Sequence, residues 1–280
     1  MSATAPTALL PALAAWATDT GLPASFAADA SMRSPEMLLV TDDPAVESGI
    51  ATGTSRPAGL AGTVDVDILA HVLPPVDTVG LTPQEVGDLR DSGVSLVDHA
   101  VDSGVPLLLL GGTGASGATE IAVSAVTATI CRKEPVTVVH HGIGADVAVW
   151  RTTVTAVRDA MFRARDYRDG PWDAGSVREI LRILGTPGLA VMVGVLTRAA
   201  ARRTPVILDG ADTLTAALLA DAAVPGASRW WLVPHLPPAP AAHLAVERLG
   251  LSPMVDRDLG IGSGAGLVAL PLLRIAVDCL

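Results

Sequence analysis

Four segments of the sequence combine glycine with aspartate, serine or threonine, and most of them follow a short apolar run. Glycine lets backbone amides approach a phosphate, and a helix that begins just afterwards favours the negative charge. Four such loops in one chain predict a shared cleft for a phosphate or a ribose, although tight turns without a ligand would show the same pattern. The loops span residues 111–117, 142–146, 209–212 and 260–264.

The first loop also fits a dinucleotide-binding fingerprint, because Gly112, Gly114 and Gly117 follow an apolar run. That fingerprint needs an acidic residue at the end of the next strand to hold a ribose. The next apolar run, residues 136–139, is predicted as a strand and ends in two histidines instead. A nicotinamide cofactor is therefore not expected.

Residues 114–118 resemble a nucleophile elbow around Ser116, and Asp209 and His235 follow in the chain order of α/β-hydrolases. These residue types are common, so chance explains the order equally well. His140 and His141 are adjacent on a predicted strand end, where their side chains point to opposite faces. No helical histidine pair with metal-ligand spacing occurs, and no metal site is expected.

Short apolar runs that alternate with helical patterns must position these loops. Runs without polar alternation indicate strands buried on both faces, and their alternation with helices predicts a parallel sheet. We therefore expect an α/β fold, Rossmann-like, with three layers (α/β/α) and a mostly parallel, doubly wound sheet. Strands are predicted at 37–41, 64–69, 105–110, 135–139, 205–208 and 230–233, and helices at 82–102, 116–129, 145–165, 176–185, 188–203, 212–222, 239–249 and 264–278.

The sequence also predicts how the chain is divided. Residues 1–35 read as an N-terminal helical segment, and residues 36–280 as one α/β domain. Residues 49–62 are rich in glycine, threonine, serine and proline, which is typical of a surface loop. The apolar helix within 188–199 suits the protein core better than a dimer surface.

Composition narrows the class of protein. Half of the 280 residues are hydrophobic and 17% are charged, so a large core is expected and general disorder is not. The net charge of -10 argues against a nucleic-acid or anionic-membrane surface. Two cysteines do not make a disulfide framework, no basic segment precedes the first apolar stretch, and no apolar run is long enough to span a membrane. These features predict a soluble, cytoplasmic protein.

Long ordered motifs in the C-terminal third resemble one enzyme family. Residues 181–210 (LRILGTPGLAVMVGVLTRAAARRTPVILDG) and 243–273 (HLAVERLGLSPMVDRDLGIGSGAGLVALPLL) are similar to the most diagnostic blocks of the nicotinate-nucleotide:dimethylbenzimidazole phosphoribosyltransferases. Residues 107–119 and 136–146 match two glycine-rich loops of that family. The resemblance covers roughly residues 37–280.

The resemblance implies a function. Members of the family transfer phosphoribosyl from nicotinate mononucleotide to 5,6-dimethylbenzimidazole, giving α-ribazole phosphate for the lower ligand of cobalamin. It also implies a Rossmann-like domain, no metal ion or cofactor, and a homodimer or a heterodimer with an intact paralogue. The substrate- and phosphate-binding residues that it indicates are Gly111, Gly114, Thr119, Gly142, Gly144, Asp209, Gly210, Gly260, Gly262, Ser263 and Gly264.

The sequence departs from the family pattern where the chemistry takes place. Ile261 stands at the position of the catalytic glutamate, and Asp258 at that of an arginine. Gly112 replaces a second loop glutamate, which lies near the nucleotide in the family, and Gly117 replaces an asparagine. A base nitrogen that attacks the anomeric carbon must lose a proton, and isoleucine cannot accept one.

Three hypotheses follow from these departures. The first is a phosphoribosyltransferase of altered specificity, in which Asp256, Asp258 or Asp42 serves as a relocated base, with Asp258 as the candidate catalytic residue. The second is a non-catalytic subunit or regulator that pairs with an intact paralogue. The third is a binding protein for a nucleotide or a cobamide precursor. The predicted small-molecule partners are nicotinate mononucleotide and an aromatic base.

Overall fold

The computed structural model describes residues 8–22, 34–113, 116–140, 146–260 and 262–278, and this part of the chain contains one six-stranded sheet. All neighbouring strands are parallel, in the order β2-β1-β3-β4-β5-β6. The strands are β1 (Glu36–Thr41), β2 (Asp67–Val72), β3 (Leu108–Gly112), β4 (Val206–Asp209), β5 (Trp231–His235) and β6 (Pro253–Val255).

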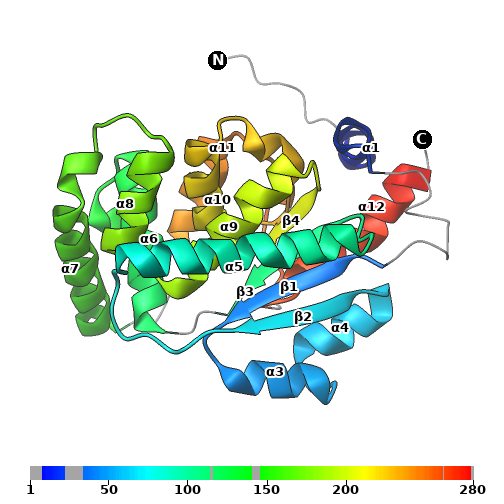
Figure 1. Cartoon of the computed structure of the whole chain (residues 1–280), viewed down its shortest axis with the longest axis horizontal. Coiled ribbons are helices and arrows are strands. Elements are labelled where there is room, and N and C mark those ends of the chain that lie inside the picture. Colours follow the sequence, from blue (N-terminus) through cyan, green and yellow to red (C-terminus); the bar gives the residue numbers. More distant parts are fainter. Residues whose placement is uncertain (1–7, 23–33, 114–115, 141–145, 261, 279–280) are drawn as a thin grey trace.

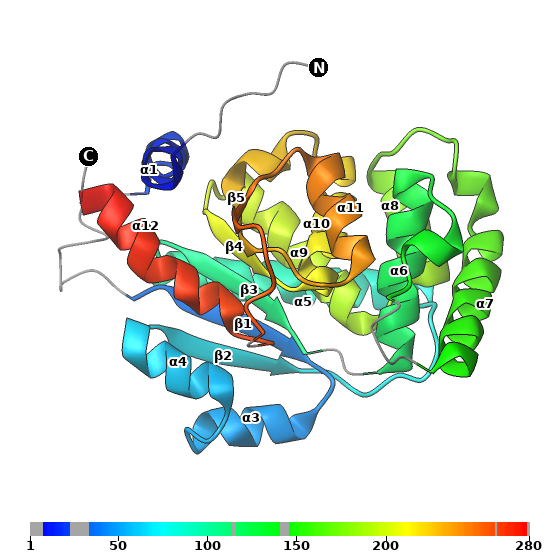
Figure 2. The same cartoon turned by 180° about the vertical axis from the view of Figure 1, so that it is seen from behind.

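Helices cover both faces of the sheet (Figures 1 and 2). Those that contribute to the larger core, on one face, are α5 (Pro83–Asp102), α6 (Gly117–Cys131), α7 (Val147–Arg163), α8 (Ala174–Leu184), α9 (Pro187–Ala201), α10 (Ala211–Ala223) and α11 (Pro240–Leu249). Those that pack into the smaller core, on the opposite face, are α1 (Leu9–Thr20), α3 (Pro44–Ala51), α4 (Arg56–Val64) and α12 (Ala269–Asp278).

The side chains of β1 show why both faces are covered. All six of its residues are buried, and successive side chains of a strand point to opposite faces. Leu38 and Val40 belong to the larger core, whereas Met37 and Leu39 belong to the smaller one. The predicted three-layer α/β fold with a doubly wound parallel sheet is therefore confirmed.

Helices α5 and α9 cross at two glycines. A Cβ on Gly93 of α5 would overlap the carbonyl oxygen of Val191, and a Cβ on Gly194 of α9 would overlap that of Arg90. The two backbones can approach so closely only because neither residue has a side chain. The middle of α9 is buried in the larger core, as expected, so the alternative that this segment forms a dimer surface is wrong.

Two predicted segments differ from the structure, and one strand was not predicted. Residues 49–62 are not a loop, because Asp43 and Ser55 cap α3 and α4 and a proline stands in the first turn of each helix. Residues 135–137 form a short 3-10 helix instead of a strand, since β3 pairs directly with β4 and leaves no place between them. Strand β6 has only three residues, too few for the sequence pattern to indicate it.

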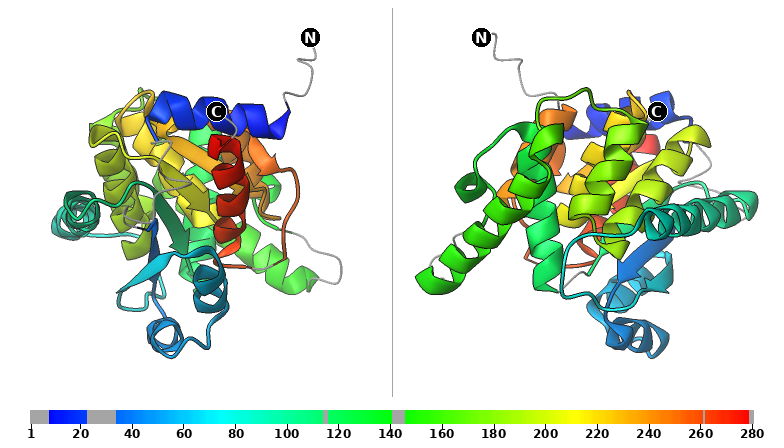
Figure 3. Two further views of the ribbon diagram at one scale, coloured as in Figure 1. Left: turned by 90° about the vertical axis from the view of Figure 1, so that its right-hand side faces the viewer. Right: turned by 60° about the vertical axis from the view of Figure 1, so that its left-hand side comes forward.

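The first and last described helices lie side by side. Figures 1 and 2 show α1 next to α12, and both helices contribute to the smaller core. Helix α7 lies at the outside of the molecule (Figure 3), where Val149 and Phe162 are exposed. In the described residues, none of the helices combines the length and the apolar character needed to cross a membrane.

Candidate functional site

The order of the strands locates the site. From β1 the sheet continues to β2 on one side and to β3 on the other, so the order reverses between β1 and β3. Loops at the carboxyl ends of strands diverge at such a point and leave a crevice, in which open α/β sheets bind their ligands. Two cavities lie in this region, and Thr119 and Asp212 line both of them.

The larger cavity has a volume of about 700 Å³, which is within the usual range for a small-molecule site. It is lined by residues that follow β3, β4, β5 and β6 and by the start of α6. The lining residues that the sequence predicted are Thr119, Asp209, Gly210, Asp258, Gly260, Gly262 and Ser263.

The remaining predicted residues fall outside this lining. Gly111 lies in β3, where a Cβ would contact Met37 and Leu39 of β1, so it serves packing in the sheet. Gly264 lies behind the cavity wall and donates its amide proton to Asp209. Gly114, Gly142 and Gly144 lie outside the described residues, as does Ile261.

Asp209 joins three segments at the base of the larger cavity. Its Oδ2 accepts a hydrogen bond from the Gly264 amide at 2.7 Å, and its Oδ1 lies 3.3 Å from Nε2 of His235. Ser263 then donates its hydroxyl to the carbonyl oxygen of Gly112 at 3.0 Å. These contacts hold the loop at 260–264 against the ends of β3, β4 and β5.

His235 lies between two carboxylates. Its Nε2 faces Asp209, and its Nδ1 lies 3.7 Å from Oδ1 of Asp258. The Nδ1 atom is buried without a hydrogen-bond partner, whereas 39% of the Asp258 side chain is exposed. The Asp258 carboxylate is therefore the acidic group nearest to this unpartnered ring nitrogen, at the wall of the larger cavity.

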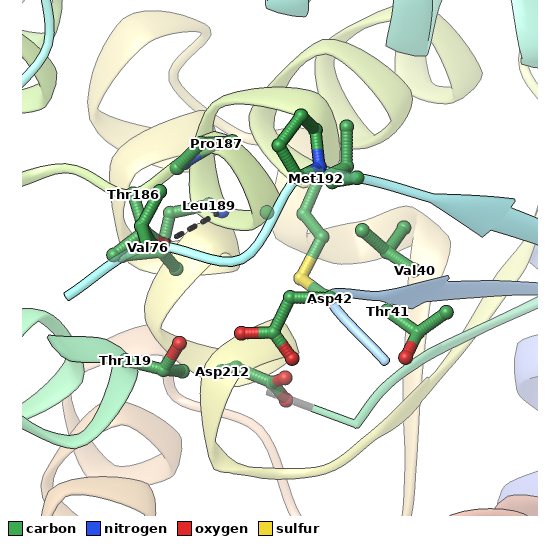
Figure 4. Close-up of a pocket in the computed structure, with 13 residues that line it drawn as sticks. Val40, Thr41, Asp42, Val76, Thr119, Thr186, Pro187, Leu189, Met192 and Asp212 are labelled. Atoms are coloured by element: carbon green, nitrogen blue, oxygen red, sulfur yellow. Dashed lines mark hydrogen bonds between the residues drawn. The ribbon is translucent and has the colours of Figure 1, made fainter. Parts of the chain in front are cut away.

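The smaller cavity is an apolar slot of about 30 Å³ beside the larger one. Val40, Leu73, Leu189 and Met192 form its apolar wall. Figure 4 shows the carboxylates of Asp42 and Asp212 close together at one end of this slot, with the Thr119 hydroxyl near them. Asp42, one of the predicted alternative bases, is therefore here and not in the lining of the larger cavity, and Asp256 lines neither.

The surroundings of Asp212 raise the pKa of its carboxyl group from an ordinary value near 3.8 to about 6. Burial is the main cause, because removal from water disfavours the charged form. The negative charges of Asp209 and Asp42 act in the same direction, whereas the hydrogen bond from the Thr213 amide opposes the rise. A carboxyl group with such a pKa exchanges protons near neutral pH.

From the sequence, His235 is considered only in the hydrolase-like order with Ser116 and Asp209, and Asp212 is given no individual role. Asp212 belongs to the acidic cluster at 209–212, and a residue so early in a helix that follows a strand points towards the ligand end of the sheet. His235 ends β5, whereas the predicted strand at 230–233 stops two residues earlier. Both signals were present, but only the tertiary structure shows which face each side chain takes.

The structure bears on the two alternative interpretations of the first glycine loop. Ser116 caps α6 by accepting the Thr119 amide, and no hydrogen bond joins it to His235, so Ser116, Asp209 and His235, all described, form no catalytic triad. The next strand after β3 is β4, not residues 136–139, and its final Asp209 is already bound by His235 and Gly264. Across the described ranges, no group of three or more histidine, cysteine or acidic side chains has the geometry of a metal site.

Comparisons with known proteins identify the family. A family model described as phosphoribosyltransferase matches residues 77–280. The chain is 39% identical over 229 residues to the nicotinate-nucleotide–dimethylbenzimidazole phosphoribosyltransferase of Corynebacterium efficiens, covering 81% of this chain and 57% of that protein. It is 40% identical over 201 residues to the protein of the same name from Mycobacterium tuberculosis, covering 71% of this chain and 54% of the relative.

The chain thus spans between half and two thirds of the length of these relatives. Among solved structures, CobT from Thermus thermophilus shares the fold with a TM-score of 0.78 and 24% identity, covering 98% of this chain and 91% of that one. The matched residues include the strands β3 to β6 and the loops that line the larger cavity. The chain belongs to this phosphoribosyltransferase family.

Proposed function

We propose that the protein transfers the phosphoribosyl group of nicotinate mononucleotide to an aromatic base of the 5,6-dimethylbenzimidazole class. The observation that carries the proposal is the cavity of about 700 Å³, which is lined by glycine-containing segments at the carboxyl ends of β3 and β4 and after β6. It is large enough for a nucleotide beside a bicyclic base. The names of the matched relatives support the same reaction.

Binding of the nucleotide would use the predicted loop residues. Amides at the start of α6 and in the loop at 260–264 suit a phosphate, because each amide offers a hydrogen-bond donor and the helix favours negative charge. No lysine or arginine is among the described residues that line either cavity. Backbone amides and the hydroxyl of Thr119 would therefore hold the phosphate, whereas the Ser263 hydroxyl donates to the Gly112 carbonyl and fixes the loop.

The acceptor must lose a proton during the transfer. Its unprotonated ring nitrogen attacks the anomeric carbon, the bond to nicotinate breaks, and the proton leaves from the other ring nitrogen. With isoleucine at position 261, Asp258 was the base predicted from the sequence, and its place beside His235 in the cavity lining supports a part in proton movement.

A second candidate function is a non-catalytic subunit or a binding protein. The isoleucine at the position of the catalytic glutamate favours it, because the missing carboxylate would then come from a partner. In that case the protein would be part of a heterodimer with an intact paralogue, whereas the first proposal is compatible with a homodimer.

Titration calorimetry and a release assay distinguish these functions. The purified chain is titrated with nicotinate mononucleotide, and nicotinate release is then measured after dimethylbenzimidazole is added. We expect binding and release. Binding without release would support the subunit or binding protein, and absence of binding would overturn both proposals.

A further inference from the structure

Asp212 and Gly112 share one space at the carboxyl ends of neighbouring strands. Gly112 ends β3, and Asp212 lies near the start of α10, directly after β4. A Cβ on Gly112 would overlap Oδ2 of Asp212 and would come within 2.6 Å of its Cγ. The space that a side chain at position 112 would enter is therefore filled by the Asp212 carboxylate, which comes from the helix after β4.

The Asp212 carboxylate is available to a ligand. Its Oδ1 accepts the Thr213 amide at 2.9 Å, while no donor in the described part of the chain binds Oδ2. Asp212 lines both cavities, so it stands where the large polar cavity meets the apolar slot. The titratable groups that face these two cavities with it are Asp42, Glu120, His140, Asp209, His235 and Asp258.

We propose that Asp212 is the general base that takes the N–H proton of the acceptor in the phosphoribosyl transfer. This inference rests on the function proposed above. In the reaction, the acceptor's free ring nitrogen forms a bond to the anomeric carbon as the carbon–nitrogen bond to the pyridinium ring breaks. Nicotinate leaves with the electron pair of that bond, and the acceptor's N–H proton passes to Oδ2 of Asp212 and then to water.

Asp212 suits this role better than the other carboxylates of the site. Asp209 is occupied by Gly264 and His235, and Asp258 is more than one-third exposed and faces His235. Burial and the neighbouring charges hold the pKa of Asp212 at about 6, so it is ionised at neutral pH and still basic enough to accept a proton. General bases work best when their pKa lies near the working pH.

The first test compares Asp212→Asn with the parent protein. We expect kcat to fall about 10²- to 10⁴-fold, since general base catalysis contributes that factor. The KM for nicotinate mononucleotide should change by about twofold or less, because the nucleotide is bound elsewhere. Asp169→Asn is the matched control, as Asp169 is 85% exposed and lines neither cavity, and its kcat should equal that of the parent.

The second test uses the pH profile of kcat. The parent should lose activity as the pH falls below about 6, where Asp212 becomes protonated. Asp42→Asn removes one of the charges that raise the pKa of Asp212, so the acidic limb should move to lower pH. In Asp212→Asn the residual activity should lack this limb.

The third test removes the carboxylate from α10 and places a new one at the end of β3. Asp212→Ala should lose kcat as Asp212→Asn does, and adding Gly112→Glu should restore part of it, because the new side chain enters the space that Asp212 vacates. The thermal unfolding temperature of each variant is measured as the control for folding. A loss of activity caused only by misfolding would not be reversed by a second substitution at the same place.

The outcomes separate this inference from the proposed function. Turnover with unchanged kcat in Asp212→Asn would overturn the inference and leave the function standing. If the parent shows no turnover, the proposed function fails, and the inference is then tested by measuring the binding of benzotriazole. Benzotriazole carries an N–H group like the acceptor and stays uncharged at mildly acidic pH. Its affinity should rise as the pH rises through about 6 in the parent but not in Asp212→Asn. A pH-independent affinity, or the same dependence in both proteins, would overturn it.

Discussion

The carboxylate of Asp209 and the amide of Gly264 are joined by a hydrogen bond of 2.7 Å that links positions 55 residues apart. Both groups are buried, so the bond ties the end of β4 to the glycine loop at 260–264 without competition from water. The same carboxylate faces His235, and one side chain therefore positions two parts of the cavity wall.

Asp209→Ala should consequently weaken both the fold and the site. The substitution leaves the Gly264 amide and the His235 ring without partners in a buried place, which we expect to lower the free energy of unfolding by about 3 kcal/mol. Urea denaturation measures this loss, and calorimetry should show weaker binding of nicotinate mononucleotide. Asp256→Ala is the control, because Asp256 is exposed and lines neither cavity. Equal stability of the two variants would contradict the role given to Asp209.

Substitutions at Gly112 and Asp212 should be coupled. Gly112→Ala alone forces its Cβ against Oδ2 of Asp212, and we expect a loss of about 2 kcal/mol in the free energy of unfolding. The same substitution in an Asp212→Ala background removes the overlap with the carboxylate and leaves only the terminal methyl group of Met192 to move aside, so it should cost at least about 1 kcal/mol less. A double-mutant cycle from urea denaturation gives this coupling energy. Strictly additive losses would show that the two positions do not share space.

The raised pKa of Asp212 predicts how the free energy of unfolding changes with pH. Between about pH 4 and pH 6 the folded state holds the Asp212 proton more tightly than the unfolded state, so this group's contribution to the free energy of unfolding decreases as the pH rises. Asp212→Asn lacks that decrease. The stability of the variant relative to the parent should therefore increase by up to about 2 kcal/mol between pH 4 and pH 7.

Thermal and urea denaturation of both proteins at a series of pH values tests this difference. The comparison removes the contributions of those carboxylates that do not interact with Asp212, because their surroundings are the same in parent and variant. A difference in stability that stays constant with pH would mean that Asp212 titrates as an ordinary exposed aspartate.

The crossing of α5 and α9 should tolerate no side chain at Gly194. Gly194→Ala would push a Cβ into the backbone of Arg90, and we expect the free energy of unfolding to fall by about 3 kcal/mol. Gly87→Ala is the matched control in α5, since a Cβ there meets nothing within 4 Å. It should leave stability unchanged or raise it by about 0.5 to 1 kcal/mol, because alanine is the better helix former. Similar effects of the two substitutions would contradict the close approach.

Much of the fold could be predicted because its strands are buried on both faces. The run at 107–110 is apolar throughout, and such runs between helical patterns indicate a parallel sheet before any contact is known. Residues 136–139 show the limit of this argument, because an apolar run also results when a connecting segment packs against the core, as Val138 and Val139 do. Helices α3 and α4 were missed because their glycines and threonines outweighed the capping residues Asp43 and Ser55.

The candidate site was predictable in its backbone and not in its carboxylates. Glycine loops at strand ends indicate a cleft from sequence order alone, since the carboxyl ends of parallel strands meet at one edge. Which acid enters the cleft depends on side-chain direction and on the neighbouring strand. Asp258, chosen from the sequence, lines the cavity, but only the pairing of β3 with β4 reveals that Asp212 reaches the space beside Gly112.

The contact between Gly112 and Asp212 also restricts how this site can change during evolution. A glutamate introduced at position 112 by one substitution would overlap the aspartate already in place, so the Asp212 side chain would have to move. Removing Asp212 first would leave an intermediate without either acid. A stepwise route between an acid at position 112 and an acid at position 212 therefore passes through a protein with both side chains in one space or a protein with neither carboxylate. Both intermediates are unfavourable, which opposes a change from one arrangement to the other.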